Sequence, residues 1–149
     1  GAFVLGITKQ DIDDIYEIRS RIEGLAAKLA AERATDEEIA ELKNTVELQE
    51  FYTLKQDADN IKNMDSTFHR LMYHMSGSTP LYDTLEPLHK RIIKYRKASI
   101  SSQTRAHESM EEHKAIYEAI AAHDGELAEK LVNEHVRKAQ ASIARREIK

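Results

Sequence analysis

Four ionisable side chains occupy positions where a helical protein would normally place apolar residues. Asp65 and His69 are four residues apart, so one helical turn brings a carboxylate and an imidazole onto the same face. His113 and His135 each lie within the apolar stripe of another helical segment. Imidazole nitrogens and carboxylate oxygens are common ligands of divalent transition metals. These four residues therefore predict a metal site.

A structural role is the alternative for each of these residues taken alone. A single inward-facing histidine is more often a hydrogen-bonded core residue than a ligand, and an Asp-His pair one turn apart is often an ordinary contact. Three imidazoles and one carboxylate from three helices would all need polar partners, and one shared cation would serve all four. Three nitrogens and one oxygen suit Zn²⁺, Ni²⁺, Co²⁺ or Mn²⁺ better than Ca²⁺ or Mg²⁺.

Two arginines also face inward by helical spacing, Arg19 and Arg96. One explanation is a salt bridge to an acidic residue of a neighbouring helix. The other is a bound small carboxylate, which would complete the metal shell with one end while an arginine holds the other. Ser99 lies beside Arg96, and Ser109 lies one turn before His113, so either hydroxyl could add a contact. The remaining histidines are expected at the surface or at an edge: His74, His89, His107 and His123.

Apolar spacing and helix breakers predict the elements that position these residues. We expect an all-α fold, an antiparallel six-helix bundle with a central pocket for metal and ligand. Pro87 should bend or split the fourth helix. The expected helices cover residues 9–34, 36–54, 58–75, 79–100, 105–122 and about 126–145.

Composition narrows the function classes. The 149 residues are 41% hydrophobic and 32% charged, with 5 Gly, 2 Pro and no Cys, which indicates one globular helical domain without disulfides or thiolate sites. A formal net charge of −4 disfavours direct binding to a phosphate backbone. No apolar run is long enough to span a membrane, and we expect a cytoplasmic protein.

Several motifs resemble the C-terminal ligand-binding domain (FCD) of GntR-type transcription regulators of the FadR subfamily. Residues 16–23 (Tyr-Glu-Ile-Arg-Ser-Arg-Ile-Glu) are similar to the first helix of that domain. Residues 65–69 (Asp-Ser-Thr-Phe-His), followed by Ser76-Gly77-Ser78, resemble its Asp-x-x-Phe-His helix and the turn after it. Ser109 with His113, and then His135 after 22 further residues, resemble its last two motifs. Six helices resemble the VanR-like subgroup.

The resemblance implies a metal held by Asp65, His69, His113 and His135, with a carboxylate effector beside it that contacts Arg19. It also implies a homodimer. Residues 1–9 would be the remnant of a linker or wing from an N-terminal winged-helix domain that binds DNA, and residues 10–149 would form the effector-binding domain. At residues 123–125 the chain has His-Asp-Gly where the family tends to have Gly-Asp, which changes a turn and not the site.

A helical metallohydrolase that uses a metal-bound water is the alternative function. This alternative is weakened because no additional carboxylate clearly flanks the four ligands as a general base. Glu112 is next to His113 in the sequence, so its side chain points about 100° away around the helix axis. A di-iron bundle would need glutamates at positions 66, 110 or 132, which hold Ser, Met and Val. A purely structural bundle is the third interpretation.

Overall fold

The computed structural model describes the backbone of residues 7–100 and 102–148 and the side chains of residues 7–93 and 102–143. This part of the chain folds into six α-helices and no strand, as the apolar spacing predicts, and each boundary lies within one turn of its expected position. The helices are α1 (Lys9–Arg33), α2 (Asp36–Leu54), α3 (Ala58–Met75), α4 (Thr79–Ile100), α5 (Gln103–Ala121) and α6 (Gly125–Ile148).

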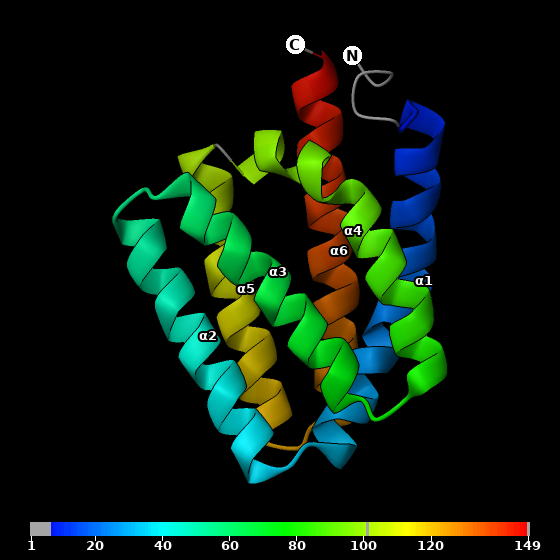
Figure 1. Cartoon of the computed structure of the whole chain (residues 1–149), viewed down its shortest axis with the longest axis vertical. Helices are drawn as coiled ribbons and strands as arrows, with labels where there is room; N and C mark the ends of the chain where they lie inside the picture. Colours follow the sequence, from blue (N-terminus) through cyan, green and yellow to red (C-terminus); the bar gives the residue numbers. More distant parts are fainter. Residues whose placement is uncertain (1–6, 101, 149) are drawn as a thin grey trace.

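Consecutive helices alternate in direction, so the start of α1 and the end of α6 lie at the same end of the bundle (Figure 1). The most extensive packing joins α1 to α6, and α2 packs against both α3 and α5. α3 crosses in front of α5 and α6 in the view of Figure 1, between α2 and α4. Within the described range, no helix combines the length and apolar character needed to cross a bilayer.

Local sequence signals explain where the helices begin and end. Thr8 and Thr35 each close a capping box with the acidic residue three positions later, which satisfies the first free N–H groups of α1 and α2. α3 ends where Gly77 adopts a positive φ of 68°, and α5 ends where His123 does so with a φ of 58°. The turn before α6 therefore has its left-handed residue at histidine rather than at Gly125.

Pro87 was expected either to bend or to split the fourth helix. α4 is not split, because the helix continues through Pro87 to Ile100. Figure 1 shows that the last turns of α4 curve away from the line of its first half, toward α5.

Most of the core among the described residues is one large apolar cluster to which all six helices contribute. Ring and aliphatic side chains such as Tyr16, Phe68, Leu85, Ile116 and Val136 are fully buried in it. Several ionisable groups are equally inaccessible, and burial of this kind requires polar partners. Those partners define the candidate site.

Candidate metal centre

Three histidines from three helices meet inside the core. His69 of α3, His113 of α5 and His135 of α6 are 0%, 0% and 1% exposed. One ring nitrogen of each lies within 4.8 Å of the corresponding nitrogen of the other two. Asp65, one turn before His69, places its Oδ1 3.5 Å from His113 Nε2 and 3.7 Å from His69 Nε2. The structure thus brings together all four residues that the sequence singled out as metal ligands.

The opposite nitrogen of each ring contacts an oxygen atom of a different partner. His69 Nδ1 lies 2.6 Å from Glu23 Oε1 of α1, and His135 Nδ1 lies 2.6 Å from Glu112 Oε1 of α5. His113 Nδ1 lies 2.7 Å from the amide oxygen of Gln49 in α2. An oxygen acceptor at Nδ1 selects the tautomer with the proton there, so each neutral ring directs an unprotonated Nε2 inward.

The spacing of these inner nitrogens fits a shared cation. His113 Nε2 and His135 Nε2 are 3.2 Å apart, close to the ~3.4 Å that separates tetrahedral nitrogen ligands ~2.1 Å from a zinc ion. Two unprotonated nitrogens at this distance repel each other unless a cation lies between them. Among the described residues, His69 Nε2 has no hydrogen-bond partner despite its burial. A cation would satisfy it as well.

Glu23 is held in its charged form by Arg19, four residues earlier on α1. Arg19 Nε donates to Glu23 Oε2 at 2.6 Å and Nη2 donates to Oε1 at 3.2 Å, with both side chains fully buried. Burial opposes the charge on each group, but their mutual attraction outweighs it. The pKa of Glu23 falls well below its usual value, also because His69 contacts it, and the pKa of Arg19 rises.

Glu112 repeats this arrangement behind His135. Arg105 donates from Nη1 and Nη2 to the two carboxylate oxygens of Glu112, both at 2.9 Å. Partial burial opposes the charge, but hydrogen bonds from His135 and Arg105 lower the pKa of Glu112 from 4.5 to about 2. Each carboxylate behind a histidine is therefore ionised and paired with its own arginine.

Two aromatic contacts fix the ring planes. Phe68 stacks on His113 with ring centroids 4.0 Å apart and planes 7° apart. His69 and His135 lie nearly parallel, with centroids 5.5 Å apart and planes 26° apart. Because the rings cannot turn freely in this packed interior, the direction of each inner nitrogen is set before anything binds.

The prediction that His89 lies at the surface or at an edge is wrong. His89 is 2% exposed, and its ring centroid lies 5.2 Å from that of His69. It brings α4 against the same cluster. The sequence indicated this burial, because His89 follows Leu85 by four residues and precedes Ile92 by three, which places all three on one helix face. The other three histidines in that group, His74, His107 and His123, are exposed as expected.

The residues predicted to bind an effector are placed as follows. Arg19 is buried, and its carboxylate partner is Glu23 on the same helix rather than a residue of a neighbouring helix. Ser109 is 6% exposed, one turn before His113. The side chains of Arg96 and Ser99 lie outside the described residues, as do residues 1–6 of the segment expected to be a linker.

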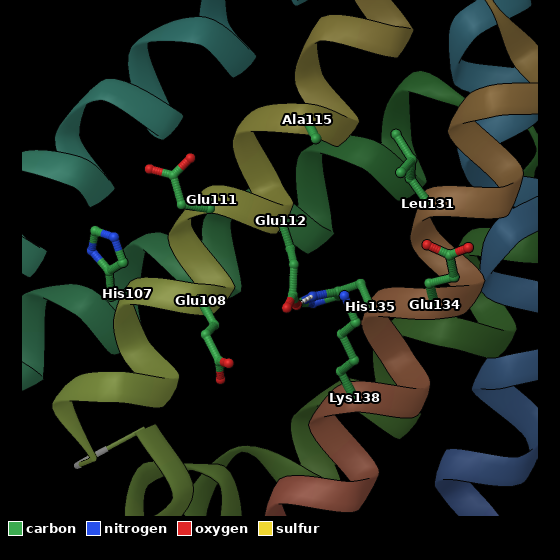
Figure 2. A pocket seen from close by; sticks show the side chains of 9 residues that line it. All are labelled: His107, Glu108, Glu111, Glu112, Ala115, Leu131, Glu134, His135 and Lys138. Carbon is green, nitrogen blue, oxygen red and sulfur yellow. Dashed lines mark hydrogen bonds and ion pairs between the residues drawn. The ribbon is translucent and has the colours of Figure 1, made fainter.

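A surface groove reaches the outer side of His135. It has a volume of about 410 Å³ and runs between α5 and α6. Figure 2 shows Glu112 and His135 facing each other across it, joined by their hydrogen bond. Four of the nine residues that line it are acidic: Glu108, Glu111, Glu112 and Glu134. His135 itself stays buried beneath the groove, whereas the Glu112 carboxylate that contacts its Nδ1 is partly exposed.

Glu23, Gln49 and Glu112 were missed as functional residues in the sequence. Glu23 carried a signal, because it follows the inward-facing Arg19 by four residues and so lies on the same stripe. Gln49 carried none, since its contact with His113 depends on how α2 packs against α5.

Comparison with known proteins places this geometry in a family. A family model described as "FCD domain" matches residues 14–138. The HTH-type transcriptional regulator YdhC of Bacillus subtilis is 28% identical, over 91% of this chain and 61% of its own length. The Galactonate operon transcriptional repressor of Escherichia coli is 27% identical, over 79% of this chain and 51% of its own length.

A solved structure shares the fold as well. Escherichia coli McbR/YncC aligns with a TM-score of 0.82 at 26% identity, over 94% of this chain and 67% of that one. The chain spans less than two thirds of the length of the curated relatives. The family model covers most of the chain, and the similar proteins include named transcriptional regulators, which leads to one conclusion: this chain belongs to the FCD domain family.

Proposed function

We propose that this domain senses a small organic or sugar acid for a DNA-binding transcription regulator, with a divalent metal as the anchor. The ligands would be Asp65, His69, His113 and His135. The observation that carries the proposal is the convergence of three Nε2 atoms whose rings are each held by an oxygen at Nδ1. Hydrogen-bonded histidines of this kind are typical of metal sites, because the outer partner orients the ring and raises its basicity.

The donor set indicates which metals to test. Three imidazoles and one carboxylate favour Zn²⁺, Ni²⁺, Co²⁺ or Mn²⁺ over Ca²⁺ and Mg²⁺, which prefer oxygen ligands. Four protein ligands leave room for further ligands on a metal that accepts five or six. When bound, the ion would supply the positive charge that anchors an anion at those positions.

The charges around the histidines support an anionic effector. Three carboxylates contact the imidazoles, from Asp65, Glu23 and Glu112, and two guanidinium groups neutralise all but one of them. With neutral histidines the cluster therefore carries one net negative charge. A divalent cation changes this to one net positive charge, which a carboxylate group would balance.

Four residues would contact the acid: Arg19, Arg96, Ser99 and Ser109. Arg19 keeps one donor for this purpose, since its Nη1 has no hydrogen-bond partner among the described residues even though the side chain is fully buried. One relative is named for a galactonate operon, and galactonate is a sugar acid of the proposed class.

Effector binding would act on the whole bundle. The cluster joins five helices through Glu23, Gln49, His69, His113 and His135, and α4 adds His89 beside them. A ligand that tightens this junction would bias the helix packing and shift the spacing of two DNA-binding domains in a homodimer. Those domains would be N-terminal winged helices docking in major grooves, in a cytoplasmic regulator.

A metallohydrolase is less well supported by the contacts at the cluster. Its metal-bound water would need a general base with a free carboxylate oxygen. The two glutamates that contact the histidines are engaged elsewhere, Glu23 by Arg19 and His69, and Glu112 by Arg105 and His135. The regulators among the relatives point the same way.

A thermal-shift experiment tests the proposed function. Purified protein is stripped with chelator and its Tm is measured alone, with each of the four metals, and with metal plus a panel of small carboxylates that includes D-galactonate. A ligand present at 100 times its Kd stabilises by about 2.7 kcal/mol, because it binds the folded state. For a domain of this size that is a rise of about 5–10 °C. No rise with any metal would refute the proposed site.

A further inference from the structure

The three partners of the outer nitrogens differ in charge. Glu23 and Glu112 are carboxylates, and each is paired with an arginine. Gln49 holds His113 at 2.7 Å with a neutral amide, from a side chain that is 1% exposed. A glutamate in its place would have nearly the same size and could make the same contact, so geometry alone does not explain the amide.

We propose that Gln49 is a specificity-determining residue, whose neutral amide keeps the metal-loaded cluster positively charged and thus able to hold an anion. This inference rests on the proposed metal site. Gln49 does one of the two things that a carboxylate would do at this position. It orients His113 by accepting from Nδ1, but it adds no negative charge.

The charge count shows why that difference matters. With Gln49, the metal-loaded cluster has one net positive charge to offer an anionic ligand. With glutamate at position 49, a further negative charge beside His113 would attract the cation more strongly and reduce the net charge of the loaded cluster to zero. The anion would then lose its electrostatic attraction while the metal gained some. Affinity for metal and affinity for anion therefore change in opposite directions.

This opposition separates the proposed role from a structural one. A residue needed only for packing, when replaced, loosens the site and weakens both metal and anion binding. The experiment therefore uses Gln49→Glu, with Co²⁺ as the metal and azide as the anion. Azide binds metals that have an open or expandable position, and visible absorption of Co²⁺ reports both binding steps.

We expect Gln49→Glu to bind Co²⁺ at least about tenfold more tightly than wild type and to bind azide at least about tenfold more weakly, the scale of outer-shell effects at metal sites. Gln49→Met, which cannot accept the bond from Nδ1, should lose 10–100-fold in Co²⁺ affinity, as typical for loss of such a partner. Glu47→Gln, an exposed change on the same helix, should leave both affinities unchanged.

The outcomes distinguish the two proposals. Wild-type protein that binds no Co²⁺ refutes the metal site and this inference together. Two results would refute only the role of Gln49. The first is a wild type that binds Co²⁺ but gives no azide response. The second is a folded Gln49→Glu variant whose two affinities change in the same direction or do not change. If circular dichroism shows that Gln49→Glu does not fold, the Co²⁺ affinity of Gln49→Met is used instead. An affinity equal to that of wild type would refute the proposed role of Gln49.

Discussion

His113 and His135, from the adjacent helices α5 and α6, face each other through their Nε2 atoms at 3.2 Å inside the core. Their Nδ1 atoms point outward to Gln49 and Glu112. Each ring is thus fixed at one nitrogen and presents the other. Under the metal site proposed above, a cation held between these rings would stabilise the folded bundle.

Removing one of these rings should abolish the stabilisation by metal. We expect His135→Ala to lose at least about 100-fold in Co²⁺ or Zn²⁺ affinity, since a four-ligand site becomes a three-ligand site and Glu112 loses its partner. Isothermal titration with chelator-stripped protein measures this. His74→Ala, an exposed change on α3, is the control and should bind metal like wild type. A His135→Ala protein that keeps wild-type affinity would remove His135 from the site.

The buried pair Arg19–Glu23 should be costly to break from the arginine side. Arg19→Met leaves the Glu23 carboxylate fully buried without its main counter-charge, which costs about 3–5 kcal/mol of the free energy of unfolding. Urea denaturation of metal-free protein measures this loss. Arg21→Met, whose side chain is 76% exposed in wild type, should change stability by less than about 0.5 kcal/mol.

A second substitution tests whether the stranded charge is the cause. Arg19→Met combined with Glu23→Gln keeps an oxygen for His69 Nδ1 but removes the buried negative charge. The double variant should therefore recover part of the loss. A double variant less stable than Arg19→Met would show that the charge is not responsible.

Glu112 should make the free energy of unfolding depend on pH between about pH 2 and pH 5. Its pKa in the folded protein is about 2, below the ordinary 4.5, so it favours the folded state above pH 4.5 and this contribution disappears as the pH falls toward 2. The difference in free energy of unfolding between wild type and Glu112→Gln should thus be largest above pH 5 and shrink toward pH 3. Urea titrations with chelator at each pH measure it.

The control for this pH series is Glu118→Gln, an exposed change on the same helix. Its difference from wild type should stay small across the range. A gap between wild type and Glu112→Gln that stays constant from pH 6 to pH 3 would mean that the ionised carboxylate does not contribute to stability through His135 and Arg105.

The sequence predicted more of the fold than of the site's surroundings. Helix limits follow from local signals, since caps such as Thr35 and breakers such as Gly77 act within a few residues. The inward positions of His69, His113 and His135 were visible because polar residues on an apolar stripe are unusual. Gln49 and Glu112 were not, because their roles depend on contacts between helices that no local pattern encodes.

Two features of α4 differ from the simplest interpretation of its sequence. His89 was expected at the surface or at an edge, but it shares a helix face with Leu85 and Ile92, and that face is buried. Pro87 was expected to bend or split α4, and the helix continues through it without a split while its last turns curve (Figure 1). A proline removes one hydrogen bond from a helix, and packing of the flanking residues can compensate for that loss.

Gly24 of α1 lies close against α6, and its substitution should reverse the usual helix preference. Alanine normally stabilises a helix interior over glycine by about 1 kcal/mol. A Cβ at position 24 would lie 2.4 Å from Asn133 Oδ1 and 2.9 Å from the backbone oxygen of Glu129. The asparagine side chain can turn away, but the backbone of α6 can only move with its helix.

We therefore expect Gly24→Ala to lower the free energy of unfolding by about 1–3 kcal/mol, the range for overpacked cores. Adding Asn133→Ala should restore only part of that loss, because the carbonyl of Glu129 remains in the way. Urea denaturation of the single and double variants measures both steps. If Gly24→Ala proves as stable as wild type, α1 and α6 are not packed as tightly as this contact requires.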